Sequence, residues 1–306
     1  MSFLQPQKSK IFFGIFFIIL MFFSVSSFAS EFEQIVKKHF NVNTGDLLEL
    51  KTDAGDVVIN TWDKNELAVE ILGNKKAKKR FEFSFNKTEF GIEIIGKRKR
   101  NGFFSWFNNI KLKYEITVPK NFDLKIKTAG GDLVLNNCEG KFDMKTSGGD
   151  IIVNSSEGEL SLSTSGGDIS IDNFDGDCNI STSGGDILMN YVDGDIIASS
   201  SGGDINIKSE SGKINASTAG GDIDVNFKGI NFGIYLTTSG GDISLQLPNS
   251  FNADVELKTS GGRVYNNFSN SSGQKVKKNK FIGNFNSGGK KVICKTSGGD
   301  ITVSGK

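Results

Sequence analysis

Six aspartates in the 306-residue chain recur at intervals of 18 residues, and each directly follows a pair of glycines. They are Asp132, Asp150, Asp168, Asp186, Asp204 and Asp222. Carboxylate oxygens are the hard ligands that Ca²⁺ prefers, so cations could bind between successive carboxylates of such a column. The same side chains could instead accept hydrogen bonds from the backbone N–H groups of their turns. Carboxylates stacked about 5 Å apart repel by about 1 kcal/mol in water, so one of these arrangements must offset the repulsion.

The calcium interpretation can be compared with the calcium β-roll, which carries Gly-Gly-x-Gly-x-Asp in both half-turns. In this chain only one half-turn carries Gly-Gly, the aspartate follows the pair directly, and the third glycine is absent. The pattern therefore favours hydrogen-bonded aspartates, with a cation ladder as the alternative. Calcium is the one cofactor that the sequence suggests.

A second cluster joins cations to aromatic rings. Its members are Lys97, Arg98, Lys99, Arg100, Phe103, Phe104, Trp106 and Phe107. Aromatic rings beside cations suit contact with an anionic lipid surface or an acidic glycan. At a lipid surface aromatic side chains are favoured at the level of the headgroups, and the cations attract the negative charge. The alternatives are a solvated basic face and an aromatic plug that seals one end of the fold.

Charge is segregated along the chain, although the whole sequence carries a formal charge of only +1. Residues 129–262 hold 20 acidic and 6 basic residues, a net charge of −14, whereas the remainder holds 15 acidic and 30 basic residues. Residues 1–29 resemble an export signal, as described below, and an exported protein rarely meets nucleic acid, so we expect envelope or cell-surface components as partners. The two opposite charges also suggest head-to-tail self-association.

Few residues are suited to catalysis. His39 is the single histidine, and three cysteines stand at positions 138, 178 and 294. The repeat places Cys178 and Cys294 among inward-facing positions, where a thiol behaves as a small core hydrophobe. Nucleophile-elbow, metal-ligand and phosphate-loop motifs are absent from the sequence, so an enzyme, such as a polysaccharide-active β-helix, is the least favoured class.

The 18-residue period predicts two short strands in each repeat. Apolar residues stand one and three positions after each aspartate, as in Ile151 and Val153, with polar residues between them. A second alternating segment precedes each Gly-Gly pair, and a second glycine column lies half a period away. Alternation with period two is typical of half-buried β-strands.

Two strands of about five residues bury no core alone, so the repeats must stack. Stacking places like residues above like, about 4.8 Å apart, and gives a parallel β-solenoid with two short strands in each coil. We expect the Gly-Gly pair to supply the positive φ that reverses the chain.

Two stretches break the period. A first coil begins near Gly45, and the strand-like segments 66–72, 80–88, 90–97 and 110–118 then predict an inserted or capping β-sheet. We therefore divide the chain into an N-terminal β region at 30–122, a regular solenoid at 123–263, and a loop-rich insertion with a final coil at 264–306.

Residues 1–29 resemble a secretory signal. Lys8 and Lys10 precede an apolar run at 11–23, and small residues at Ser27 and Ala29 suit cleavage after Ala29. Retention of this run as an anchor is the alternative. We expect a protein of the periplasm, the outer surface or the extracellular space.

The sequence resembles a bacterial β-strand-repeat, adhesin-like family of unknown molecular function. The resemblance is carried by the export signal, by the segment from Leu48 to Ile59 that runs into Thr61-Trp62-Asp63, by Tyr114-Glu115-Ile116-Thr117-Val118-Pro119, and by the Thr-Ser-Gly-Gly-Asp-Ile units. It implies an adhesive or structural role in the envelope and brings no catalytic residues. Arg263 departs from the motif, which puts the turn of its coil in question.

These observations predict a non-catalytic, exported binding and scaffold protein of the cell envelope or surface, with a β-solenoid fold and an N-terminal β-sheet cap. The second hypothesis is a solenoid that Ca²⁺ stabilises and whose assembly the cation switches.

Overall fold

The computed structural model describes residues 32–99 and 109–306, and Phe32–Lys306 form one compact unit. The predicted signal at 1–29 and the predicted contact residues Arg100, Phe103, Phe104, Trp106 and Phe107 lie outside the described residues. The described chain folds into 25 strands of one hydrogen-bonded sheet and one six-residue helix, α1 (Lys75–Arg80). None of its helical structure is long and apolar enough to cross a membrane.

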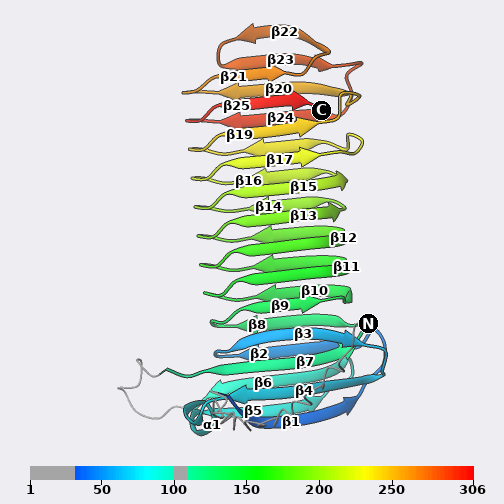
Figure 1. Cartoon of the computed structure of the whole chain (residues 1–306), viewed down its shortest axis with the longest axis vertical. Helices are drawn as coiled ribbons and strands as arrows, with labels where there is room; N and C mark the ends of the chain where they lie inside the picture. Colours follow the sequence, from blue (N-terminus) through cyan, green and yellow to red (C-terminus); the bar gives the residue numbers. More distant parts are fainter. Residues whose placement is uncertain (1–31, 100–108) are drawn as a thin grey trace, which may run out of the picture. The chain divides into compact units, whose positions relative to one another are not determined.

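Most strands form two parallel stacks, which we call the first face and the second face (Figure 1). The first face holds the strands that precede each Gly-Gly turn: β2 (Leu47–Thr52), β8 (Asp123–Thr128), β10 (Glu139–Lys145), the second halves of β11 (Ile151–Ser163) and β12 (Ile169–Ser181), β14 (Ile196–Ser199), β16 (Ile214–Ser217), β18 (Ile234–Thr237), β20 (Ala253–Thr259) and β24 (Lys291–Thr296).

The second face holds the strands that follow those turns: β3 (Asp56–Trp62), β9 (Leu133–Asn136), the first halves of β11 and β12, β13 (Ile187–Asp193), β15 (Ile205–Ser211), β17 (Ile223–Phe227), β19 (Ile243–Leu247), β21 (Val264–Asn267) and β25 (Ile301–Gly305). The predicted β-solenoid is therefore confirmed. Its coils, which we call rungs, are more continuous than expected, since β11 and β12 pass through the corner between the faces without a break.

The core lies between the two faces and consists of stacked, inward-facing apolar side chains. Ile151 pairs in register with Ile169, and Ile169 pairs with Ile187. All three side chains are buried, as is the Cys178 thiol on the first face. A fully buried isoleucine contributes about 1.5–3 kcal/mol relative to an exposed one, so each rung is stabilised mainly by the rungs beside it.

The two glycine columns have different roles, and the predicted origin of the Gly-Gly turn was wrong. Among the described Gly-Gly pairs that form the turn before the aspartate column and Arg263, only the pair containing Gly131 has a residue with a positive φ. The second glycine is instead required by close stacking, because a Cβ on Gly167 would overlap the carbonyl oxygen of Gly149 in the rung below. Positive φ belongs to the other column, at the opposite corner, where Gly158 has a φ of 130° and Gly176 a φ of 135°.

Each end of the solenoid interleaves its coils out of sequence order. At the N-terminal end, β2 lies between β8 and β6 (Gly91–Arg98). In the same way, β3 lies between β9 and β7 (Leu112–Pro119). At the C-terminal end, β24 lies between β18 and β20 on the first face, and β25 lies between β19 and β21 on the second face. The last coil in sequence is therefore enclosed by two others.

Antiparallel strands close both ends. At the N-terminal end β4 (Glu66–Gly73) pairs with β7, β1 (Glu33–Asn41) pairs with β4, and β5 (Phe81–Lys87) pairs with β6. At the C-terminal end β23 (Lys280–Phe285) pairs with β20, and β22 (Ser271–Lys277) pairs with β23. These strands confirm the N-terminal β-sheet cap.

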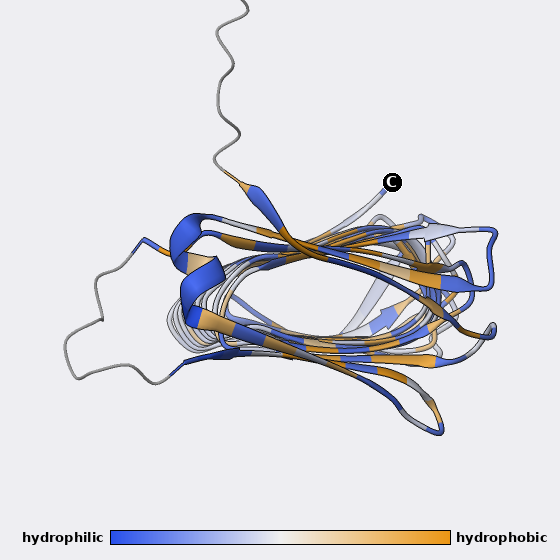
Figure 2. Cartoon of the chain, turned by 90° about the horizontal axis from the view of Figure 1, so that it is seen from below, coloured by the Kyte–Doolittle hydropathy of each residue, from blue (hydrophilic) through white to orange (hydrophobic). Residues whose placement is uncertain are grey.

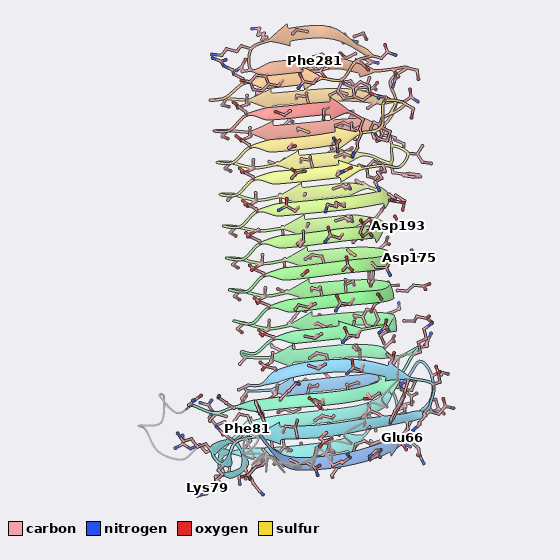
Figure 3. The ribbon with its side chains drawn as sticks, viewed as in Figure 1. Glu66, Lys79, Phe81, Asp175, Asp193 and Phe281 are labelled. Atoms are coloured by element: carbon pink, nitrogen blue, oxygen red, sulfur yellow. The ribbon has the colours of Figure 1, made fainter. Side chains whose placement is uncertain are left out.

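Aromatic side chains plug the space inside both caps. At the C-terminal end the rings of Phe268 and Phe285 stack with centroids 4.2 Å apart, and Phe281 lies beside them (Figure 3). At the N-terminal end Phe83 packs edge-on against Tyr114, which is fully buried. Within the described chain the plugs are therefore made by residues outside the predicted aromatic cluster.

Candidate functional site

The repeated aspartates form a continuous hydrogen-bonded ladder at the Gly-Gly-Asp corner. The backbone N–H of Asp150 donates to Oδ1 of Asp132 at 2.9 Å, and the N–H of Asp168 donates to Oδ1 of Asp150 at 2.8 Å. The same bond joins every later rung of the corner. In spatial order the nine accepting carboxylates are Asp56, Asp132, Asp150, Asp168, Asp186, Asp204, Asp222, Asp242 and Asp300.

Arg263 occupies the outermost rung of this ladder. Its backbone N–H donates to Oδ1 of Asp300 at 2.7 Å, so the coil keeps the same turn despite the substitution. An aspartate in this column accepts a bond from the next rung outward, and the described chain places no further rung of this corner beyond Arg263. An acceptor is therefore unnecessary there.

Buried hydroxyl groups hold the same corner from inside. Thr164 Oγ1 donates to the carbonyl oxygen of Gly149 at 2.9 Å and accepts the N–H of Gly167 at 3.3 Å. Equivalent residues repeat these contacts in the neighbouring rungs. A column of inward hydroxyl groups is thus present, and it fixes the turn that positions the carboxylates.

In this geometry each backbone N–H donates to a charged carboxylate, and such a hydrogen bond is about twice as strong as one between neutral groups. These bonds offset the repulsion between neighbouring carboxylates. The residues that the structure describes contain no group of three or more His, Cys, Asp or Glu side chains arranged to hold a metal ion. Calcium binding at the ladder stays a prediction.

The described members of the predicted basic cluster lie at the end of β6. The Arg98 backbone N–H donates to Asp53 Oδ2 at 2.8 Å, and its guanidinium lies 5.9 Å from the centroid of the Phe81 ring. The Lys99 ammonium lies 3.5 Å from a carboxylate oxygen of Glu82. Lys97 is exposed.

The charge pattern differs from the two opposite poles that the sequence suggested. Basic residues gather at both ends, on α1 and the end of β6 at one end and on β22 and the following turn at the other. The acidic rungs lie between them. This arrangement does not favour the predicted head-to-tail contact, because it would bring two basic ends together.

The three thiols are buried and free of disulfide bonds. Burial raises the pKa of Cys138, Cys178 and Cys294 to about 12 in each case. A thiol is a weak nucleophile while it stays protonated, so these side chains serve as core hydrophobes, as predicted for Cys178 and Cys294.

A groove of about 640 Å³ on the first face was not predicted, and we call it the acidic groove. It runs from β2 and β8 to β14, between two columns of outward side chains. One column consists of Asp123, Lys141, Glu159, Asp177 and Asp195. The other consists of Lys125, Asp143, Ser161, Asn179 and Ile197. The first column directly follows the second glycine column in most rungs, and this spacing was the sequence signal available for it.

The carboxylates of the acidic groove differ in their partners. Glu159 lies 3.0 Å from the Lys141 ammonium, and Asp143 lies 2.9 Å from that of Lys145. Asp177 accepts the backbone N–H of Asp195 at 2.9 Å, and Asp195 accepts that of Lys213 at 2.8 Å. Five carboxylates against two lysines leave the groove negative, with its most acidic part toward β14.

Comparison with known proteins identifies the family. A family model described as Toastrack DUF4097 matches residues 46–304. No curated protein is significantly similar to the chain.

Several solved structures are similar at low identity. A candidate adhesin from Bacteroides fragilis is 17% identical, with 70% of this chain and 97% of that chain covered and a TM-score of 0.45. A candidate lipid binding protein from Parabacteroides distasonis is 14% identical, with 90% and 97% covered and a TM-score of 0.32. A candidate cell adhesion protein from Clostridium sporogenes is 12% identical, with 90% and 100% covered and a TM-score of 0.25.

Proposed function

Because the chain belongs to the Toastrack DUF4097 family, an adhesin-like family of unknown function, we propose that it is an exported, non-catalytic binding and scaffold protein of the cell envelope or surface. Its partner is a neutral or amine-bearing glycan chain, held in the acidic groove. The single observation that carries this proposal is the groove itself, which crosses successive rungs of the first face.

The groove suits a linear partner, because its polar groups repeat from rung to rung about every 4.8 Å. Carboxylate and amide oxygens accept hydrogen bonds from hydroxyl or ammonium groups, and the exposed Ile197 adds an apolar contact. An acidic partner would be repelled by the five carboxylates. The buried thiols and the sequence signal support the non-catalytic and exported parts of the proposal.

Chitosan oligosaccharides serve as the amine-bearing probe, and isothermal titration measures their binding. We expect Asp177→Asn with Asp195→Asn to weaken binding about tenfold or more, because the charge is lost while each side chain keeps an Oδ1 that accepts its backbone N–H. The matched control is Asp168→Asn with Asp186→Asn, which removes the same charge from the Gly-Gly-Asp corner. Equal losses in both variants, or no binding by the unmodified protein, would contradict the assignment of the groove.

The proposed location has a separate test. Protease added to intact cells is expected to cleave the protein if it lies on the outer surface, and to spare it until the envelope is opened if it lies in the periplasm. Protection that persists after the outer barrier is opened, and that ends only on cell lysis, would contradict export.

A further inference from the structure

A basic surface at the N-terminal end brings together residues that are distant in sequence. Helix α1 begins after Asn74, whose Oδ1 accepts the N–H of Ala77 at 2.9 Å. Its C-terminus meets the end of β6, where the Lys99 N–H donates to the Arg80 carbonyl oxygen at 2.7 Å. We define the basic end as the exposed lysines that meet here, which are Lys75, Lys76, Lys78, Lys79 and Lys97.

These lysines are available to a partner, although Lys78 and Lys79 also lie in the last turn of α1, where positive charge favours the helix dipole. None of the five forms an ion pair with another described residue, and Ala77 is the buried residue of α1. Lys75 and Lys76 lie in the first turn of the helix, where positive charge is unfavourable to the helix dipole. Figure 2 shows α1 as a hydrophilic helix at one corner, and Figure 3 shows Lys79 on the outside of it.

The chain enters the solenoid at this same end. β1 closes the end together with β5, since the Phe40 and Phe85 rings lie 6.1 Å apart and the Lys38 ammonium lies 4.4 Å from the Phe85 ring centroid. Nine residues separate the apolar run at 11–23 from Glu33, the first residue of β1. In the form of the protein that retains the apolar run as an anchor, the sequence therefore joins this run to the end that carries these lysines.

The rungs between the two ends of the solenoid carry the opposite charge. Residues 129–262 have a net charge of −14. Surface attraction falls off within a Debye length of about 8–10 Å, which is roughly two rungs. An anionic surface would therefore attract the basic end and repel the acidic rungs, which favours an end-on orientation.

We propose that the basic end is a docking surface for an anionic lipid bilayer, with the acidic rungs directed away from the membrane. This goes beyond the proposed function, because it concerns the end of the solenoid and not the acidic groove. Each juxtamembrane lysine strengthens binding at an anionic surface by about fivefold, so a cluster of five gives a measurable affinity.

The test is co-sedimentation of the full chain with vesicles of equimolar phosphatidylglycerol and phosphatidylcholine. We expect the quadruple variant Lys75→Gln, Lys76→Gln, Lys78→Gln and Lys79→Gln to bind at least about tenfold more weakly. Glutamine is a good helix former and these side chains are exposed, so the fold is retained. The matched control removes the same charge from the other end, through Lys275→Gln, Lys277→Gln, Lys278→Gln and Lys290→Gln, and is expected to bind nearly as well as the unmodified chain.

Each alternative has its own outcome. Binding that survives high salt and is unchanged by the α1 variant would show that the apolar run alone holds the vesicles, and would overturn the proposal. Equal losses in the two quadruple variants would indicate unspecific charge attraction and would also overturn it. Equal binding to pure phosphatidylcholine vesicles, or retention by an anionic polysaccharide but not by lipid, would exclude an anionic bilayer as the partner.

Discussion

The middle of the solenoid and its two ends use the same two-strand coil but are held by different contacts. In the middle, every rung donates an N–H to one neighbour and offers a carboxylate to the next, as Asp168 does between Asp150 and Asp186. At the ends the period stops, and the chain uses aromatic plugs such as Phe268 on Phe285, antiparallel strands and interleaved coils.

This difference follows from what a repeat can supply. A rung with the repeat sequence forms hydrogen bonds with the rungs on both sides of it. The last rung of a stack has a neighbour on one side only, so its backbone N–H and C=O groups on the other side are exposed. Arg263 illustrates the change, because it donates to Asp300 like any other rung and has no carboxylate to offer. The ends therefore require residues that the repeat does not contain. Because these residues differ from one end to the other, they allow the two ends to bind different partners.

The largest effect is expected in the middle, at the second glycine of a Gly-Gly pair. Gly167→Ala would place a Cβ against the carbonyl oxygen of Gly149, so we expect a loss of about 3 kcal/mol in the free energy of unfolding, measured by chemical denaturation. The control is Gly166→Ala in the same turn, where the nearest atom would lie 3.8 Å away. Alanine there should be neutral or stabilise by up to about 1 kcal/mol. Equal losses at both positions would contradict the close-stacking explanation.

A smaller effect is expected from the carboxylate ladder. Asp186→Ala removes the acceptor of the Asp204 N–H and should cost about 1–2 kcal/mol, whereas Asp186→Asn keeps an acceptor and relieves repulsion, so it should change stability little. Arg263→Ala at the outermost rung should also change stability little. If Asp186→Asn were as harmful as Asp186→Ala, the charge and not the hydrogen bond would be the important feature.

The same variants separate the calcium hypothesis from the hydrogen-bonded ladder. With the repulsion already offset by N–H groups, we expect the melting temperature to be the same in chelator and in excess Ca²⁺. A large rise with Ca²⁺ that Asp186→Asn abolishes would establish a cation ladder instead.

The smallest effects concern two carboxylates whose pKa values shift in opposite directions. Hydrogen bonds from Lys51 and Lys125 lower the pKa of Glu49 near the N-terminal end, so its contribution is present above its unfolded pKa and is lost as pH falls through the folded value. Burial, partly opposed by Lys208, raises the pKa of Asp224 in the middle, so its ionised form destabilises the fold at neutral pH and the penalty disappears in acid.

We therefore expect Glu49→Gln to lower stability at neutral pH by about 0.2–1 kcal/mol and Asp224→Asn to raise it. Both differences should shrink at acid pH, as the pH falls through the folded pKa of each carboxyl and its charge is lost. Denaturation at the two pH values measures this, and a change of the same sign for both variants would contradict the assigned causes.

The sequence predicted the middle far better than the ends, for a physical reason. A period of 18 residues indicates which side chains lie one above the other in adjacent rungs, so the pairing of Ile151 with Ile169 could be inferred directly. The order in which the coils stack is not encoded in the repeat. The strands β24 and β25 have the same alternation as any other coil, whether they stack before or after β20 and β21. The sequence therefore could not place the last coil.

The site was predicted in part. The aspartate column and its role as a hydrogen-bond acceptor were predicted, although the six did not include Asp56, Asp242 and Asp300, and the donor is an N–H of the neighbouring rung and not of the aspartate's own turn. The acidic groove was missed, since the alternation of each strand shows which side chains face outward but does not show a hollow between their columns. The meeting of α1 with the end of β6 depends on the antiparallel pairing of β5 and β6, which the alternation of the two segments does not fix.

The central claim is that rungs stack in register and that the last coil is enclosed by coils that precede it in sequence. Cysteine pairs on the second face test it, because the native thiols are buried and register partners lie within disulfide reach. Ser244→Cys with Thr302→Cys should form a disulfide rapidly on mild oxidation, since the two residues pair across β19 and β25. Ser244→Cys with Tyr265→Cys should not, because β25 lies between them. The reverse result would show that the coils stack in simple sequence order and would contradict the account.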